Sequence, residues 1–133
     1  MEVMADTTVL IDLWRYQKTP RRLDDLTRKL SEAAILVPWI TQAEFSRGAL
    51  FKNVSLEMLA EFYKSFHLVP LDQAVMDTYC RLWVEMARAG RGTDYPDLWI
   101  AACAVAWQVP VLTRNPKHFA NVPELKVIGY EIV

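Results

Sequence analysis

The chain has little of what marks a secreted scaffold, a membrane protein or a disordered protein. Its 133 residues include 2 cysteines, Cys80 and Cys103, without the spacing of a disulfide framework, which favours a reducing cytoplasm. Glycine and proline are scarce, at 4 and 7 copies, as in a compact globular protein. The longest apolar run, around residues 98–107, is far shorter than the ~20 residues that span a membrane. The acidic N-terminal segment, with Glu2 and Asp6, does not resemble a secretion signal.

An excess of positive charge is also missing. The chain has 15 Lys and Arg residues and 16 Asp and Glu residues, so its net charge is −1. This charge excludes a protein that coats nucleic acid through an overall positive electrostatic potential. Any contact with nucleic acid must therefore use basic residues gathered at one site. Hydrophobic residues are plentiful at 53% of the chain, which is enough to build one continuous core, so we expect a single domain over residues 1–133.

Short strands alternate with helices along the chain. Apolar segments predict strands at residues 3–6, 35–37, 68–71, 109–113 and 126–128. Helical spacing predicts helices at about residues 8–16, 20–30, 42–50, 56–66, 72–90 and 96–107, the last one apolar almost all round and therefore buried. Strands separated by helices pair in parallel, so the pattern indicates an α/β fold with a parallel sheet covered on both faces.

Several tryptophans lie on the predicted helices. Trp83, Trp99 and Trp107 fall on apolar helical faces, so we expect all three in the core. Trp14 lies near a segment end, and with Leu10 and Leu13 it is a hypothetical exposed apolar surface for a partner.

Three acids follow predicted strands. Asp6 ends the first strand, Glu44 lies in the first turn of the helix after the second, and Asp97 opens the helix before the fourth. Ligands of open parallel sheets bind at the carboxyl ends of the strands, so these acids are expected in one cleft. At ~4 Å and an effective dielectric near 20, two carboxylates repel by about 4 kcal/mol, so a proton or a cation must lie among them. Oxygen ligands suit Mg²⁺ or Mn²⁺, which can activate a water for attack on a phosphodiester.

Each acid also has a purely structural interpretation. Asp6 can cap its own helix. Thr41 and Glu44 match the capping-box pattern T-x-x-E. Asp94 and Asp97 form a similar local pair, and acids near a helix N-terminus gain from the helix dipole. Caps alone do not require an acid at all three places, so both interpretations stay open.

Four segments carry a likeness to a known family. They are MADTTVLIDL, ITQAEFSRGAL, YPDLWIAACAVAWQVPVLTRN, and TRNPKHF followed by LKVIGY. With these segments, in this order over residues 4–130, the sequence resembles the PIN-domain family and within it the VapC-type toxins. The resemblance implies a three-layer α/β/α sandwich with a central parallel sheet. It also implies Mg²⁺- or Mn²⁺-dependent cleavage of RNA by the toxin of a toxin–antitoxin pair, a small antitoxin partner and a homodimer.

The resemblance assigns the metal-holding and catalytic acids to Asp6, Glu44 and Asp97. The closing loop of the family often offers a further acid, whereas this chain has Asn115 and His118 at the corresponding positions. The amide of Asn115 can ligate Mg²⁺ or orient a water but brings no charge. A second metal ion therefore stays an open question. Asp94, about one helical turn before Asp97, is either an extra acid or a helix cap.

Hydroxyl and basic side chains near these acids complete the expected site. Thr8 stands where the family often has Asn or Ser, and Thr8 and Thr113 are expected to act as hydroxyl helpers. The expected RNA-binding residues, which would contact phosphates, are Arg114, Lys117 and Arg47. Arg47 could instead pair with Glu44. His118 is expected to be an ordinary surface residue.

Two other functions stay open. A catalytically inactive PIN-like module that binds RNA or a partner is favoured by His118 and by the absence of the further acid. Such a module should show no stabilisation by divalent ions. A receiver-like domain phosphorylated on Asp6 is disfavoured, because no acidic pair adjoins the first strand and Glu44 would have no role.

Overall fold

A computed structural model describes residues 1–93 and 95–133, and one parallel sheet lies at its centre. The strands within this part of the chain are β1 (Glu2–Ala5), β2 (Ala34–Pro38), β3 (His67–Val69), β4 (Val111–Thr113) and β5 (Val127–Gly129). Their order across the sheet is β3-β2-β1-β4-β5, and every neighbouring pair is parallel. The predicted α/β fold with a central parallel sheet is confirmed.

Helices connect the strands, largely where the sequence predicts them. The α-helices of the described part are α1 (Thr7–Arg15), α2 (Asp24–Lys29), α3 (Trp39–Phe51), α4 (Leu56–Tyr63), α5 (Gln73–Arg88) and α6 (Tyr95–Trp107). Two short 3-10 helices are η1 (Pro20–Leu23) and η2 (Pro116–Phe119). Over the described residues, no helix is both long enough and apolar enough to cross a membrane.

Two helices differ from their predicted bounds: one is divided in two and the other begins earlier. The segment 20–30 forms η1 and then α2, with Pro20 opening η1 at a position that needs no backbone N–H. The helix predicted from residue 42 begins at Trp39, directly after Pro38 at the end of β2. Thr41 therefore lies inside α3 and does not cap it.

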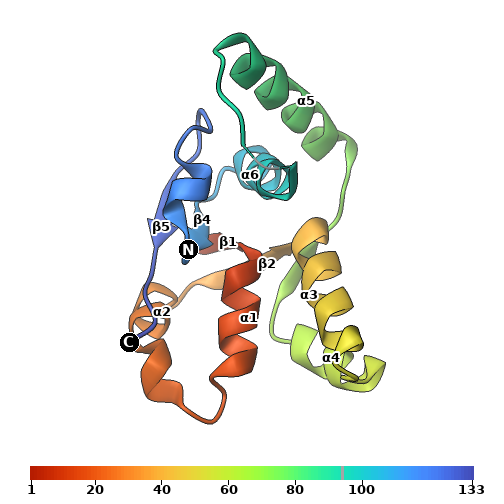
Figure 1. Cartoon of the computed structure of the whole chain (residues 1–133), viewed down its shortest axis with the longest axis vertical. Coiled ribbons are helices and arrows are strands. Elements are labelled where there is room, and N and C mark those ends of the chain that lie inside the picture. Colours follow the sequence, from red (N-terminus) through yellow and green to blue (C-terminus); the bar gives the residue numbers. More distant parts are fainter. Residues whose placement is uncertain (94) are drawn as a thin grey trace.

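The strands turn alternate side chains to opposite faces of the sheet, as parallel strands buried on both sides do. One set packs under α5 and α6 and includes Met4, Leu36 and Val111. The other set includes Val3, Ala5, Val37 and Leu112, which pack with α1, α2, α3 and α4. Figure 1 shows α5 and α6 on one side of the sheet and α1 and α2 on the other. The predicted three-layer sandwich is confirmed.

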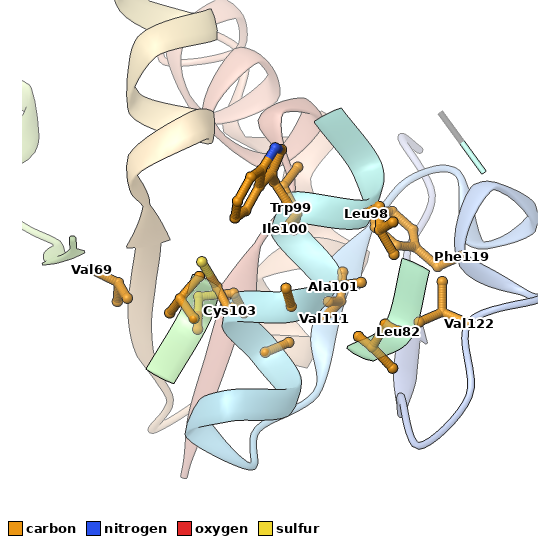
Figure 2. Close-up of a cluster of buried hydrophobic side chains, with 14 of the residues drawn as sticks. Val69, Leu82, Leu98, Trp99, Ile100, Ala101, Cys103, Val111, Phe119 and Val122 are labelled. Atoms are coloured by element: carbon orange, nitrogen blue, oxygen red, sulfur yellow. The ribbon is translucent and has the colours of Figure 1, made fainter. Parts of the chain in front are cut away.

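Helix α6 is the buried helix that its composition predicts. Its residues from Leu98 to Ala104 are all buried. Figure 2 shows Trp99, Ile100 and Cys103 of this helix among buried side chains from other elements. The position of Trp99 in the core is therefore confirmed.

The predictions for Trp83 and Trp107 are wrong. Trp83 is 54% exposed and Trp107 is also exposed. Helix α5 is an outer helix that covers α6 with Val75, Leu82 and Met86, so Trp83, next to Leu82, faces away from the core. The apolar face of α5 is wider than the part of it that packs on α6.

The segment after β5 is tied to α2. The backbone N–H of Glu131 donates to Asp25 Oδ2 at 2.8 Å, and Lys29 Nζ donates to the carbonyl oxygen of Gly129 at 2.7 Å. Lys29 Nζ also lies 3.7 Å from Asp25 Oδ2. These contacts hold the C-terminal segment against the α1–α2 side of the sheet.

We expect the contribution of Asp25 to stability to disappear in acid. The hydrogen bond from Glu131, with Lys29 and Arg28 nearby, lowers the pKa of Asp25 below 3.8. A carboxyl group whose pKa is lower in the folded than in the unfolded protein stabilises the folded protein at pH values above the unfolded-state pKa. That stabilisation is lost as the pH falls through the folded-state pKa. Asp25→Asn should therefore lower Tm by a few degrees at neutral pH, and the difference should shrink below pH 3.8. Thermal unfolding of both proteins across this range measures it, and a difference that does not change with pH contradicts the expectation.

Candidate active site

The carboxyl ends of β1 and β4 lie side by side in the middle of the sheet. Ala5 is in register with Leu112, and the backbone N–H of Asp6 donates to the carbonyl oxygen of Leu112 at 3.1 Å. The chain builds β2 and β3 on one side of β1 and then β4 and β5 on the other, so the strand order reverses here. Open parallel sheets bind ligands at this kind of point.

Asp6 is held at this point by three donors. The backbone N–H of Thr7 donates to Asp6 Oδ1 at 2.7 Å, so Asp6 does cap α1. The hydroxyls of Thr8 and Thr113 donate to Asp6 Oδ2 at 3.0 and 2.7 Å, which a cap does not require. The residue is only 6% exposed, and none of these three donors carries a positive charge. The negative charge of Asp6 is therefore fixed in place without being neutralised by these contacts.

Glu44 reaches the same place from α3. The hydroxyl of Thr7 donates to Glu44 Oε1 at 2.8 Å, while the backbone of Thr7 holds Asp6. One residue thus joins the two carboxylates. Arg47 Nη2 lies 3.9 Å from Glu44 Oε2, and its side chain is largely exposed, so it remains accessible to a ligand.

Thr41 fixes α3 to the end of β1. It is fully buried, and its hydroxyl donates to the carbonyl oxygen of Ala5 at 3.0 Å. The capping-box interpretation of Thr41 and Glu44 is wrong, because α3 begins two residues before Thr41. Thr41 instead sets where α3, and with it Glu44, lies relative to Asp6.

Asp97 lies in the first turn of α6, beside the segment that follows β4. His118 Nδ1 is 3.6 Å from Asp97 Oδ2, and the hydroxyl of Thr93 donates to the backbone oxygen of His118 at 2.8 Å. His118 is exposed, as predicted, yet it contacts one of the candidate acids. Asp94, the possible extra acid, lies outside the described residues.

The segment after β4 is anchored on the hydroxyls that hold Asp6. The backbone N–H of Arg114 donates to Thr8 Oγ1 at 3.2 Å, and that of Asn115 donates to Thr113 Oγ1 at 3.0 Å. Lys117 follows in η2 and is exposed. The two predicted hydroxyl helpers therefore connect Asp6 to Arg114 and Asn115.

The oxygen-rich surroundings of Asp6 suit a hard divalent cation. Within residues 1–93 and 95–133, no three acidic, His or Cys side chains are grouped so that they alone could hold a metal ion. The contacts bring Asp6 and Glu44 together through Thr7, and Asp97 together with His118. Mg²⁺ is usually bound through one or two carboxylates, with waters and phosphate oxygens as its other ligands. The pair of Asp6 and Glu44 matches that donor set, and the meeting of all three acids around one ion stays a prediction.

Comparison with known families identifies this arrangement. A family model described as the PIN domain matches residues 3–125. The chain belongs to the PIN domain family. Ribonuclease VapC1 of Methanocaldococcus jannaschii is similar to this PIN domain, with 29% identity over 130 residues that cover 98% of this chain and 88% of the relative. The resemblance predicted from the four segments is confirmed.

Solved structures share the fold of this PIN domain. VapBC2 from Rickettsia felis, bound to a DNA fragment from its promoter, gives a TM-score of 0.79 at 21% identity and covers 98% of this chain and 100% of that one. A toxin–antitoxin complex from Klebsiella pneumoniae gives 0.70 at 25% identity and covers 98% and 99%. Both similarities extend over nearly the whole of this PIN domain and of the matched chains.

The contacts of Thr7 in the PIN domain site were not predicted from the sequence. Their only signal is the place of Thr7 between Asp6 and Thr8, where three polar residues follow an apolar strand. The burial of Asp12 was also missed, although Asp12 follows Val9 by three residues and so shares its buried face of α1.

Proposed function

We propose that this PIN domain is a divalent-metal-dependent endoribonuclease and the toxin of a toxin–antitoxin pair. The observation that carries the proposal is the buried carboxylate of Asp6 at the reversal point of the sheet, held by uncharged donors and joined to Glu44 through Thr7. The similarity to Ribonuclease VapC1 over nearly the whole chain supports a nuclease.

Asp6, Glu44 and Asp97 would hold the Mg²⁺ or Mn²⁺ ion. When bound, such an ion lowers the pKa of a coordinated water and polarises the phosphodiester. Thr8 and Thr113 keep the carboxylate of Asp6 in one orientation, so its free lone pairs stay directed to the same place.

The segment after β4 would handle the RNA. The backbone N–H of Asn115 binds the Thr113 hydroxyl, and the side-chain amide of Asn115 would orient the attacking water through its oxygen. Arg114 and Lys117, with Arg47 from α3, would bind backbone phosphates. A local basic group of this kind is compatible with a chain whose net charge is −1.

A small antitoxin would inhibit the enzyme, and the active form would be a homodimer in the cytoplasm. The toxin–antitoxin complex from Klebsiella pneumoniae supports such a partner. An apolar groove between α1 and α3 is lined by Ile11, Trp14 and Phe45 and includes Glu44, so an apolar segment bound there would adjoin the site. Leu10 is fully buried and takes no part in this surface, contrary to the sequence-based hypothesis.

The test is cleavage of total bacterial RNA by wild type and by Asp97→Asn, with Mg²⁺, with Mn²⁺ and with a chelator. We expect divalent-dependent cleavage by the wild type and a loss of at least about tenfold in the variant, because a carboxylate ligand is replaced. Asp77→Asn makes the same chemical change at an exposed position of α5 and should cleave like the wild type. Equal cleavage by wild type and Asp97→Asn rejects the assignment.

A second candidate function is an inactive PIN module that binds RNA without cutting it. Asn115 and His118, in a loop where the family often has a further acid, favour it. Thermal unfolding with increasing Mn²⁺ separates the two, since the nuclease should be stabilised by the ion and the inert module should not.

A further inference from the structure

A buried carboxylate lies behind the candidate active site and takes no part in the proposed metal site. Asp12 is fully buried on α1, six residues after Asp6. Its Oδ2 accepts hydrogen bonds from Arg114 Nε at 2.9 Å and from the hydroxyl of Tyr130 at 2.7 Å. Burial of the Asp12 charge costs desolvation energy that offsets much of its attraction to Arg114, so stability alone explains this pair poorly.

Arg114 is fixed from two sides. Its backbone N–H donates to the hydroxyl oxygen of Thr8, whose own proton goes to Asp6. Its side chain is bound at Nε by Asp12 but remains 37% exposed, so the guanidinium spans from the interior to the surface. Within the described residues, its two Nη atoms make no hydrogen bond, and their donors are available to a ligand.

Tyr130 completes the support of the carboxylate. It directly follows β5, is almost fully buried, and donates to the same oxygen of Asp12 that binds Arg114. Burial, and then the hydrogen bond to Asp12, raise the pKa of Tyr130 above 10, so its hydroxyl keeps its proton and is a constant donor. The orientation of the Asp12 carboxylate is thereby set by Arg114 and Tyr130, which lie 102 and 118 positions after it in the sequence.

A guanidinium prepared in this way is suited to a phosphate. Its planar N–H donors match two oxygens of a phosphate group at once. An exposed arginine loses rotamer freedom when it binds, whereas one already held at Nε loses less. The backbone N–H of Arg114 binds the Thr8 hydroxyl that itself donates to Asp6, and the side chain binds Asp12 on the helix that Asp6 caps, so Arg114 is anchored to the same helix as Asp6.

We propose that Asp12 and Tyr130 are positioning residues, which hold the guanidinium of Arg114 against α1, the helix that Asp6 caps, so that its Nη atoms bind a backbone phosphate of the RNA. The choice of RNA as ligand rests on the proposed function. Asp12 itself does not contact the substrate and acts through Arg114.

The test compares Asp12→Asn, Arg114→Ala and the double variant. Binding of a fluorescently labelled RNA hairpin is measured without divalent ions, and kcat and KM are measured with Mg²⁺. We expect Asp12→Asn and Arg114→Ala each to raise Kd and KM about tenfold with a smaller change in kcat, as for the loss of one charge-assisted hydrogen bond. The double variant should be no weaker than Arg114→Ala, because both changes remove the same contact. A general loss of stability would not produce this non-additivity.

Tyr130→Phe gives a second test if Asp12→Asn does not fold. It keeps the ion pair of Asp12 and Arg114 and removes only the hydroxyl, so Kd should rise a few-fold. The matched control is Asp25→Asn, which loosens Glu131, the neighbour of Tyr130, without touching Arg114. RNA binding by this control should equal that of the wild type, and weakening as large as that of Tyr130→Phe overturns the proposal.

The outcomes separate this proposal from the ribonuclease assignment. One outcome is that the wild type cleaves RNA with divalent ions, and that Asp12→Asn raises Kd by the same factor in the wild type and in Arg114→Ala. This outcome overturns the positioning role and leaves the nuclease assignment in place. RNA binding that depends on Asp12 through Arg114, without cleavage, supports the positioning role and rejects the nuclease. A wild type that neither binds nor cleaves RNA rejects both.

Discussion

Replacement of Asp6 by asparagine should lower divalent-dependent RNA cleavage by at least about a hundredfold, because loss of a supporting contact to a metal ligand alone costs about 10- to 100-fold. Asparagine has one oxygen and no charge, so it is a poorer ligand for a hard cation. Asp6 is the carboxylate at the reversal point of the sheet, and three donors already fix its position. Asp6→Asn should therefore weaken metal binding without moving the other side chains of the site.

The fold of the Asp6→Asn protein should survive. Asparagine caps a helix as well as aspartate does, so α1 keeps its N-cap. The hydroxyls of Thr8 and Thr113 can rotate and accept a hydrogen bond from the new amide, since a hydroxyl is both donor and acceptor. Thermal unfolding without divalent ions should give a Tm within a few degrees of the wild type.

Cleavage rates at saturating Mg²⁺, with thermal unfolding of the same samples, measure this effect. Asp24→Asn is a matched control, because it makes the same change at an exposed position at the start of α2. Its cleavage rate should equal that of the wild type. An Asp6→Asn protein that is folded and cleaves RNA at the wild-type rate would remove Asp6 from the site.

Truncation of Phe119 to alanine should give the largest loss of stability, about 3–5 kcal/mol in the free energy of unfolding. Phe119 is 1% exposed and ends η2, the turn that follows Asn115. Figure 2 shows its ring beside Leu98 and near Val122, in the cluster under α5 and α6. Its removal leaves a cavity and also frees the segment that places Asn115 and His118.

Urea unfolding measures the loss, and the chain offers a matched control. Phe51, at the end of α3, is 89% exposed, so Phe51→Ala removes the same atoms from solvent-exposed surface. Its effect should stay within about 0.5 kcal/mol. Equal destabilisation by the two variants would show that the ring of Phe119 does not pack as described.

Apolar periodicity was sufficient to predict the sheet and its covering layers. The strands and the buried helix α6 follow from short runs of residues that are apolar on every side. The same pattern failed at Trp83, because the periodicity of α5 shows an apolar face but not how much of that face a neighbour covers. Coverage depends on the packing of α5 on α6, which no local pattern records.

The candidate site was predictable to the level of its acids. Asp6, Glu44 and Asp97 could be singled out because each follows or precedes a strand that ends at one edge of the sheet. The structure joins Asp6 and Glu44 through Thr7, and the place of Asp97 in the same site stays a prediction. The hydroxyl contacts of Thr7 and Thr41 could not be predicted, because they join residues that are 37 and 36 positions apart in the sequence. Such contacts depend on where α3 packs, which the sequence pattern leaves undetermined.

The central position of β1 has a consequence for synthesis on the ribosome. β1 is translated first, yet one of its two neighbours is β4, and the hydrogen bond between Asp6 and Thr113 joins residues 107 positions apart. A nascent chain that ends before β4 lacks the Thr113 hydroxyl and the Leu112 carbonyl oxygen, which both bind Asp6. A polypeptide that stops before β4 therefore lacks the assembled candidate site, which can form only after β4 has been synthesised.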